Sequence, residues 1–528
     1  MTVNLKGLGV PMALAQMVMP RLDGARLGDG EYLKEVKGLV DAGVGGFILF
    51  GGDYHEVRKG IAGLQARAKI PLIIASDMER GAGQQLKGAT VFPCQMAVAA
   101  ATDLVSGDGF GLVSDMMEGV ALEARAAGVG AILAPVLDVN SNPENPIICT
   151  RAFSDEPATV SRLGELYVKG LQGSRVAVSA CGKHFPGHGD TTLDSHAKLP
   201  VIDKDKESLD DEDLRPFRKA VMAGVDMVMT GHLMVPAIDP EYPASLSRKI
   251  TTGYLRNRAG FDGLVLTDAL DMGALKGMFS AREAARLAVK AGADILLHPA
   301  DPRALLAELA GLAKDKEIMK ADVVDILRRL QKAKGMRNSP VKLTDEQIET
   351  QFTRHRELAR AIALRALTLV KAGGAFPSIK DIKGTVANIV LEDDGDQMAG
   401  RTLRSGLLNR HKKLKNHFIT KAVATTQTAG ALKLAQGADL TIVSIFSRVR
   451  AGKGRAGVSR ELADLGRLIV SKSKRSVVVS FGSPYTLRDF MDADFVVAAY
   501  DPGEATQEAA IVALSGDIVF RGELPVRI

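Results

Sequence analysis

Tryptophan is absent from this chain of 528 residues, and cysteine is scarce. A missing Trp argues against an open cleft that binds long polysaccharides by ring stacking and favours a small, polar, hydrogen-bonding pocket. The three cysteines are far apart and form no CxxC pair, which argues against a disulfide framework and suits a reducing compartment. They are Cys94, Cys149 and Cys181.

Long apolar runs are also absent. No run approaches the length needed to cross a bilayer. The first 24 residues carry one early lysine and an apolar run interrupted by Gly, Pro and Gln, unlike a signal peptide. We therefore expect a cytoplasmic protein without a membrane partner.

Basic residues are not gathered into one surface. The 68 Lys and Arg residues are interspersed with 62 Asp and Glu residues, and the net charge is +6. The closest candidate for a basic face, RHKKLKNH (410–417), predicts a solvated helix or loop, because nucleic-acid binding needs clustered basic residues with aromatics between them. The composition predicts no nucleic-acid partner.

Apolar segments rich in β-branched residues recur over the first 300 residues, separated by helix-like stretches. Such segments predict a parallel sheet covered on both faces. About eight repeats favour a (β/α)8 TIM-type barrel, with an open doubly wound sheet as the alternative. The predicted strands lie at 45–50, 71–77, 130–139, 176–185, 226–234, 263–271 and 294–299, with a less certain one at 12–19.

The length predicts more than one domain. We expect a barrel over 1–340, a helical linker over 341–377 and a smaller α/β sandwich domain over 378–528. The sandwich domain contains four strand-like segments, at 385–394, 439–447, 476–485 and 495–503. Its Gly-rich segment RVRAGKGRAG (448–457) lacks the order of a phosphate-binding loop and predicts a mobile surface loop.

Polar residues stand where the barrel strands end. The carboxyl ends of the strands of a barrel open onto one face, where substrate sites are built. A single polar strand end could be a cap, but a set of them predicts a site. The set comprises Asp77, Asp138, Lys183, His184, His232, Asp268 and His298.

The stretch CGKHFPGHGDTTLDSHAKLP (181–200) allows three interpretations. A zinc site could use His184 and His188, but the intervening Pro and Gly residues prevent a regular helix. A phosphate cradle would need a helix N-terminus that nothing here marks. For acid catalysis, Asp194 and His196 lie two residues apart, on the same side of an extended backbone. Glycoside hydrolysis also needs an ionised carboxylate besides the proton donor. Asp268 is the candidate, and Asp271 is also considered.

KHFPGHGDTTLDSH, followed by GFDGLVLTDALDM, strongly resembles the bacterial β-N-acetylglucosaminidases of glycoside hydrolase family three. The resemblance continues through PLIIASDMERGAGQ, the block from 134 to 157, and VVVSFGSPY in the second domain, so it covers nearly the whole chain. It implies an exo-acting retaining β-N-acetylglucosaminidase without a cofactor or metal, acting on muropeptide-derived fragments in cell-wall recycling or on chito-oligosaccharides.

The same resemblance implies the residue roles. Asp268 is expected as the nucleophile, and His196, held by Asp194, as the general acid and then the general base. Sugar-binding residues are expected at Asp77, Arg151, Lys183, His184, His232 and Met272. His188 and Asp190 are expected to shape the loop.

The segment after Asp77 departs from the family pattern. It reads MERGAGQQ, and Gln85 stands near the place of an arginine found in many members. Alternatives therefore stay open: a GlcNAc phosphorylase, because a neutral histidine would not repel phosphate; a β-glucosidase; and a non-catalytic sugar-binding protein. We expect a monomer or homodimer.

Overall fold

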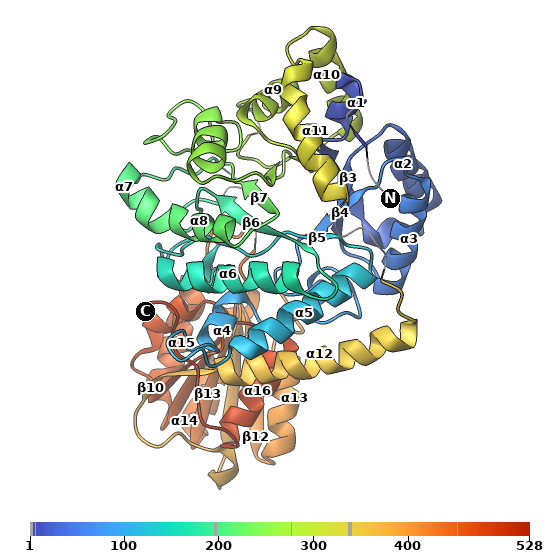
Figure 1. Ribbon diagram of the computed structural model, residues 1–528. Helices are drawn as coiled ribbons and strands as arrows, with labels where there is room; N and C mark the ends of the chain where they lie inside the picture. Colours follow the sequence, from blue (N-terminus) through green and yellow to red (C-terminus); the bar gives the residue numbers. More distant parts are fainter. Residues whose placement is uncertain (1–3, 6, 195–197, 276, 336–340, 451) are drawn as a thin grey trace. The chain divides into compact units, whose positions relative to one another are not determined.

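The computed structural model describes residues 4–5, 7–194, 198–275, 277–335, 341–450 and 452–528. The chain divides into two compact units, coloured along the sequence in Figure 1. Each unit is made of three segments of the chain. Unit 1 comprises Met1–Val91, Val113–Val139 and Pro157–His355, and unit 2 comprises Phe92–Leu112, Asn140–Glu156 and Arg356–Ile528.

Unit 1 is an α/β barrel of parallel strands, as the sequence predicts. The strands are short and mostly buried, because helices cover their outer side and side chains fill the barrel interior; Arg21, at the start of β2, is exposed. The strands are β1 (Val18–Met19), β2 (Arg21–Asp23), β3 (Gly46–Phe50), β4 (Ile73–Ser76), β5 (Ala131–Ile132), β6 (Ser179–Phe185), β7 (Met227–Thr230), β8 (Leu264–Thr267) and β9 (Leu296–Leu297).

The strand order closes the barrel. Strands β2 to β8 form one sheet in sequence order, and β1 pairs with β9 in parallel. A bridge between Leu266 and Ile295 joins β8 to β9, and β1 continues into β2 after Pro20. The expected strand at 12–19 is only partly correct, because its first half forms the helix α1 (Val10–Ala15).

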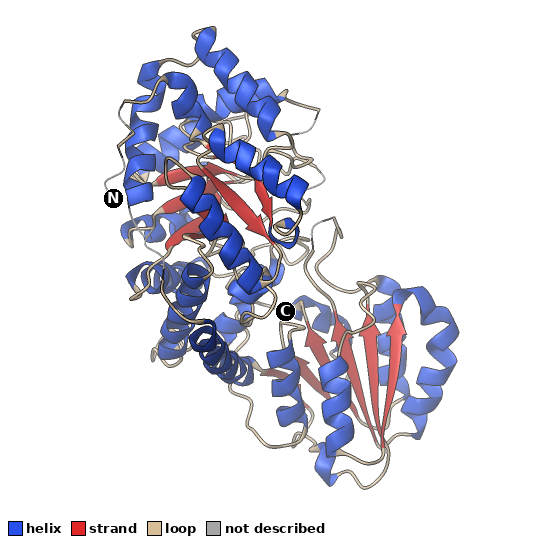
Figure 2. Ribbon diagram, turned by 90° about the vertical axis from the view of Figure 1, so that its right-hand side faces the viewer, coloured by secondary structure: helices blue, strands red, loops and turns tan. Residues whose placement is uncertain are grey.

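Amphipathic helices surround these strands (Figure 2). Several begin at an Asp whose carboxylate accepts hydrogen bonds from the first turn, as Asp29, Asp53 and Asp301 do. The helices of this part are α2 (Gly30–Asp41), α3 (Tyr54–Arg67), α5 (Phe110–Ala126), α6 (Pro157–Gly173), α7 (Lys206–Ser208), α8 (Leu214–Met222), α9 (Ala281–Ala291), α10 (Pro302–Lys314), α11 (Lys320–Gly335) and α12 (Asp345–Ala366), with π-helical turns η4 (Leu209–Asp213) and η5 (Lys249–Arg258).

Unit 2 contains a six-stranded sheet in the order β10-β15-β14-β13-β11-β12. All pairs are parallel except β10 with β15. Its strands are β10 (Thr368–Ala372), β11 (Val386–Glu392), β12 (Leu414–Thr420), β13 (Leu440–Phe446), β14 (Ser476–Phe481) and β15 (Phe495–Ala498). Its helices are α4 (Gln95–Ala100), α13 (Arg401–Arg410), α14 (Ala424–Gly437), α15 (Arg460–Lys472) and α16 (Glu504–Leu514). Helices α13 and α16 pack together, as do α14 and α15, which gives an α/β sandwich.

Three features of unit 2 differ from the sequence predictions. β10 lies inside the segment expected as a helical linker. β12 takes up part of RHKKLKNH, because an edge strand tolerates polar side chains on its open side. In the segment expected as a mobile surface loop, Lys453 is 5% exposed and pairs with Asp394 at 2.7 Å and Asp393 at 3.5 Å.

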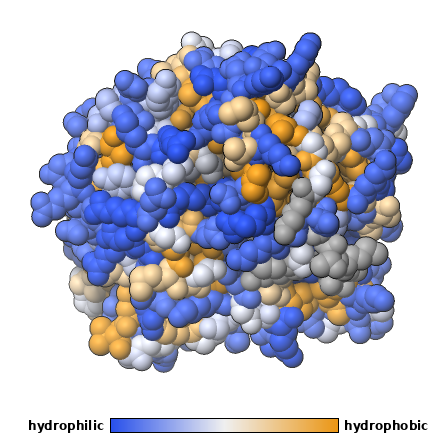
Figure 3. Space-filling view, turned by 45° about the horizontal axis from the view of Figure 1, so that its top comes forward, coloured by the Kyte–Doolittle hydropathy of each residue, from blue (hydrophilic) through white to orange (hydrophobic). Residues whose placement is uncertain are grey.

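The face of the molecule in Figure 3 is mostly hydrophilic, with hydrophobic residues in small groups. Within the described residues, no helix combines the length and the apolar character that a membrane crossing requires.

Candidate active site

A buried lysine marks the centre of the carboxyl face of the barrel. Lys183, on β6, is 2% exposed, and its Nζ lies 2.6 Å from Asp77 Oδ1 and 2.7 Å from Glu79 Oε1. Both carboxylates follow β4, which ends at Ser76. Two carboxylates offset the cost of burying one ammonium and fix its position. The exposed fraction of the Asp77 side chain is 28%, so this member of the cluster can reach a ligand.

A second buried cluster orients His184. Asp138 is fully buried, and its Oδ2 lies 2.7 Å from His184 Nδ1. Its Oδ1 accepts hydrogen bonds from the backbone N–H groups of His184 and His188, at 3.1 and 2.7 Å. Burial alone would raise the pKa of Asp138, but the charge and hydrogen bond of His184 hold it below its ordinary value. The ionised carboxylate therefore fixes a proton on Nδ1 and holds the ring of His184 in one orientation.

His188 supports the loop from within. Its side chain is 2% exposed, and Nδ1 lies 2.8 Å from the Thr191 hydroxyl. Burial, with His184 nearby, lowers the pKa of His188 to about 4, so the ring is neutral near pH 7. These contacts agree with the expectation that His188 shapes the loop.

Asp268 follows the last residue of β8, at the same end of the barrel. Its backbone N–H donates to Thr230 O at 2.9 Å, which ties the residue to β7. Its Oδ1 accepts from the N–H of Ala269 at 2.8 Å. The side chain is half-buried, so its carboxylate can meet a ligand above the barrel.

His232 holds the segment after Asp268. Its Nε2 donates to Ala269 O at 3.0 Å, and its Nδ1 accepts from the Ser245 hydroxyl at 2.7 Å. Met272, 6% exposed, donates from its backbone N–H to the same carbonyl. Both ring nitrogens of His232 thus have protein partners, and a direct contact of His232 or Met272 with a sugar stays a prediction.

The charged groups of these clusters act on one buried thiol inside the barrel. Burial raises the pKa of Cys181 to about 12; Lys183 opposes that shift, whereas Asp77 and Asp268 add to it. Asp77 contacts Lys183 directly, and Asp268 follows β8 at the same end of the barrel.

Three further site residues are predicted from the sequence, at Asp194, His196 and Arg151. Asp194 is 6% exposed and accepts a hydrogen bond from Lys198 N at its backbone carbonyl. His196 lies outside the described residues. Arg151 belongs to unit 2, at the end of the turn η3 (Cys149–Arg151), and its guanidinium donates to Ile147 O at 3.0 Å. Their roles stay predictions.

The sequence reasoning missed Glu79. It also noted Asp138 only as a polar strand end, whereas the structure gives it the orienting position beside His184. The one available signal for Glu79 was its place two residues after Asp77, in a segment without regular periodicity.

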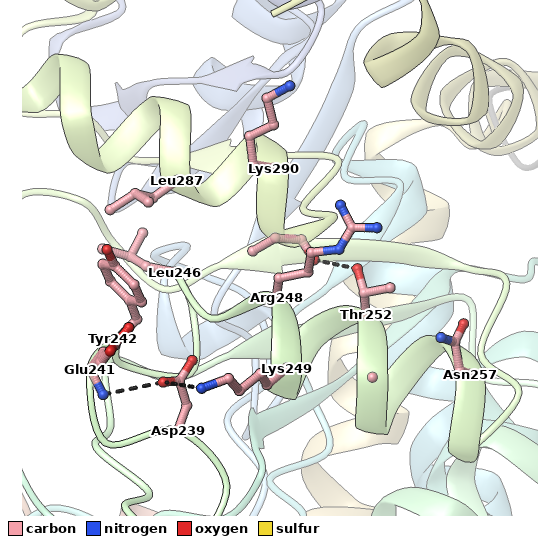
Figure 4. Close-up of a pocket in the computed structure, with 12 residues that line it drawn as sticks. Asp239, Glu241, Tyr242, Leu246, Arg248, Lys249, Thr252, Asn257, Leu287 and Lys290 are labelled. Atoms are coloured by element: carbon pink, nitrogen blue, oxygen red, sulfur yellow. Dashed lines mark hydrogen bonds and ion pairs between the residues drawn. The ribbon is translucent and has the colours of Figure 1, made fainter. Parts of the chain in front are cut away.

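A separate pocket of unit 1, with a volume of about 510 Å³, lies along η5 and α9 (Figure 4). Asp239 lies at its edge, with Lys249 Nζ at 3.4 Å and the backbone N–H of Glu241 at 3.2 Å. None of the predicted site residues lines this pocket. Over the described part of the chain, no group of three or more His, Cys, Asp or Glu residues is arranged to hold a metal ion.

Comparison with known proteins gives a family match over most of the barrel. The model described as "Glycosyl hydrolase family 3 N terminal domain" matches residues 12–333. The chain is 32% identical over 382 residues to "Beta-hexosaminidase A" of Pseudoalteromonas piscicida; the match covers 66% of this chain and 63% of that protein's own length.

Two further similarities extend over nearly the whole chain. It is 28% identical over 527 residues to "Beta-N-acetylglucosaminidase/beta-glucosidase" of Cellulomonas fimi, covering 94% of this chain and 90% of that protein. Among solved structures, it resembles a glycoside hydrolase family 3 β-N-acetylglucosaminidase from Paenibacillus sp. str. FPU-7. That likeness has a TM-score of 0.84, 29% identity and 99% coverage of both chains.

Proposed function

This chain belongs to glycosyl hydrolase family 3, and from that premise we propose that it is an exo-acting, retaining β-N-acetylglucosaminidase that removes terminal β-linked GlcNAc. The observation that carries the proposal is the buried Lys183, held between Asp77 and Glu79 at the end of the barrel where Asp268 follows β8. Such a site offers fixed hydrogen-bonding groups for hydroxyls next to a carboxylate able to attack a carbon centre. The names of the relatives support GlcNAc as the sugar.

The reaction has two displacements. In the first, an Asp268 carboxylate oxygen attacks C1 of the sugar, the glycosidic C1–O bond breaks, and His196 gives its proton to the leaving oxygen. In the second, water attacks C1 and passes a proton to His196, and the C1–O bond to Asp268 breaks. The sugar leaves with its configuration retained. The unperturbed pKa of a histidine, about 6.5, suits a group that gives and retakes a proton.

The remaining residues position the sugar. Lys183 donates a hydrogen bond to a hydroxyl, and Asp77 and Nε2 of His184 accept hydrogen bonds from hydroxyls. Asp138 keeps His184 in one orientation. Arg151, His232 and Met272 complete the expected sugar-binding set.

Two classes of natural substrate fit an exo-acting enzyme of this kind: muropeptide-derived fragments, in cell-wall recycling, and chito-oligosaccharides. We keep a cytoplasmic location and a monomer or homodimer as predictions.

Hydrolysis of p-nitrophenyl β-N-acetylglucosaminide tests the proposal. The β-glucoside runs in parallel, both with and without phosphate, and the released sugar is identified by NMR from its first moments. We expect free β-configured GlcNAc, independent of phosphate. Asp268→Ala and His196→Ala should lower kcat by a factor of about a thousand or more, because each removes a reacting group.

The matched control is Asp262→Ala, which removes an exposed carboxylate paired with Arg328. This variant should keep full activity. Phosphate-dependent release of GlcNAc 1-phosphate would instead make the protein a phosphorylase, and faster release of glucose would make it a β-glucosidase. Binding of GlcNAc without any turnover would leave a non-catalytic sugar-binding protein.

A further inference from the structure

Four side chains form a continuous cluster on the carboxyl rim, outside the groups assigned above. The guanidinium carbon of Arg21 lies 4.8 Å from the centre of the Phe50 ring. The rings of Phe50 and His298 are 5.6 Å apart between centroids, at an angle of 40°. His298 Nδ1 lies 3.3 Å from Asp271 Oδ1. We call Arg21, Phe50, His298 and Asp271 the rim cluster.

The strand order explains why these residues meet. Arg21 begins β2, Phe50 ends β3, and His298 directly follows β9. Asp271 lies in the segment after β8, whose Leu270 N–H donates to Leu297 O at 2.9 Å. Neighbouring strands of the closed barrel therefore place all four side chains on one side of its carboxyl end.

The rim cluster lies beside the end of β4. Gly51, next to Phe50, donates its backbone N–H to Gln85 Oε1 at 3.3 Å, and Gln85 Nε2 donates to Asp77 O at 3.1 Å. One side chain therefore connects the end of β3, which carries Phe50, to Asp77, the partner of Lys183.

Two features indicate a binding role beyond packing. His298 has φ of 46°, in the left-handed region, and such strained residues concentrate at functional sites. The side chain of Arg21 is 50% exposed, and its distance to Asp23 Oδ2 is 3.8 Å, longer than a hydrogen bond. Its planar guanidinium lies over a ring and keeps donors for a ligand.

Both polar atoms of the Gln85 amide have backbone partners. Its Nε2 donates to Asp77 O at 3.1 Å, and its Oε1 accepts from Gly51 N at 3.3 Å. The amide therefore links the ends of β3 and β4. Lys183 is held between Asp77 and Glu79, whereas Arg21 is half-exposed over the Phe50 ring.

We propose that the rim cluster is a subsite for the outer hydroxyls of the terminal sugar, those on C4 and C6. Arg21 donates to a hydroxyl, Asp271 accepts from one, and the Phe50 and His298 rings contact the C–H face, the role that Trp has in other carbohydrate sites. This inference rests on the proposed function and adds a specificity determinant to it. It makes the enzyme sensitive to the configuration at C4.

The test couples a side-chain change to a substrate change. Arg21→Gln is assayed with p-nitrophenyl β-GlcNAc and with its 4-deoxy and 6-deoxy analogues. We expect kcat/KM for the parent to fall about ten- to a hundredfold, mostly through KM, because the contact is remote from the reacting bond. For the analogue that lacks the contacted hydroxyl, the variant should differ from the wild type by less than about threefold.

Arg26→Gln is the matched control. Arg26 lies in the same segment, over the Tyr32 ring at 4.3 Å, and is 55% exposed. It should keep wild-type kinetics with every substrate. An Arg21 variant as active as the Arg26 variant, or one that loses the same factor with all three sugars, would overturn the proposal.

Two further experiments distinguish the alternative interpretations. If Arg21→Gln slows chitobiose but not the p-nitrophenyl glycoside, the cluster contacts the leaving sugar, and the assignment to the terminal sugar is wrong. A wild-type protein that hydrolyses no β-GlcNAc substrate would contradict the proposed function. Calorimetric binding of GlcNAc and 4-deoxy-GlcNAc to the wild type and Arg21→Gln would then decide on the subsite itself.

Discussion

Asp138→Asn tests whether the buried cluster at His184 sets the hydrogen-bonding state of that ring. The carboxylate receives three hydrogen bonds, from His184 Nδ1 and from two backbone N–H groups. In the variant, the amide oxygen can keep both backbone N–H groups, since both go to Oδ1. The amide NH2 then faces His184 Nδ1, which must become an acceptor. The proton moves to Nε2, and the side of the ring that meets the sugar changes from acceptor to donor.

The size of the effect follows from the kind of bond lost. A hydrogen bond to a charged group contributes about 1.5–3 kcal/mol. If His184 contacts a sugar hydroxyl, the wrong tautomer removes about this amount from transition-state binding. At about 1.4 kcal/mol per factor of ten, kcat/KM should fall about 10- to 150-fold. The free energy of unfolding should fall by a similar amount, because the site is fully buried.

The assay compares kcat/KM for p-nitrophenyl β-GlcNAc with the free energy of unfolding in urea. Asp294→Asn is the control at the opposite end of the barrel. Asp294 is also fully buried, with Arg256 at 2.6 Å and Arg329 at 2.8 Å. Its variant should lose about 3–5 kcal/mol of stability, because it leaves buried cations less compensated, while the folded enzyme keeps its kcat/KM. Full activity of folded Asp138→Asn, or an equal loss in the two variants, would refute the reasoning.

The remaining predictions concern His188 and Glu79. The folded-state pKa of His188, about 4, lies below the unfolded value of about 6.5, so stability from this group is full above pH 6.5 and falls as pH decreases toward 4. Between about pH 7.5 and 5, this single group should lower the free energy of unfolding, measured in urea, by about 2 kcal/mol. The His188→Gln variant should lose less stability over that range. Equal losses in the wild type and the variant would contradict this prediction. Glu79→Gln should lower stability by about 1.5–3 kcal/mol and raise KM, since Lys183 loses the charge of one of the carboxylates that hold it. Unchanged melting and unchanged KM would show that Glu79 does not hold Lys183.

The barrel could be predicted because its signal is local. Buried parallel strands are apolar on both faces, and each ends where the chain turns polar, so Asp77, Lys183 and Asp268 were found as strand ends. The strand expected at 12–19 carried the same apolar composition but no periodicity to separate a helix turn from a strand, and α1 forms over its first half. β12 was not predicted as a strand because half of its residues are polar, as is usual in an edge strand, and such a segment resembles a loop in sequence.

The finer parts of the site depend on contacts distant in sequence. Asp138 and His184 are 46 residues apart, and Lys183 and Asp77 are 106 apart. No spacing rule predicts which carboxylate meets which cation across a barrel. Arg21 was missed for a related reason, since only closure of β1 onto β9 brings it near His298.

Buried charge is used differently at the two ends of the barrel. At the amino end, Lys334 donates to the carbonyls of Gly45 and Pro71, each at 2.6 Å, and burial lowers its pKa to about 7. Both of these acceptors are backbone carbonyls shortly before the first residues of β3 and β4. At the carboxyl end, Lys183 meets two carboxylates, and Asp268 follows β8 at the same end. Within this group of four residues, three carboxylates thus stand with one ammonium. Glycoside cleavage develops positive charge at the anomeric carbon, so such a rim favours the transition state over the neutral ground state.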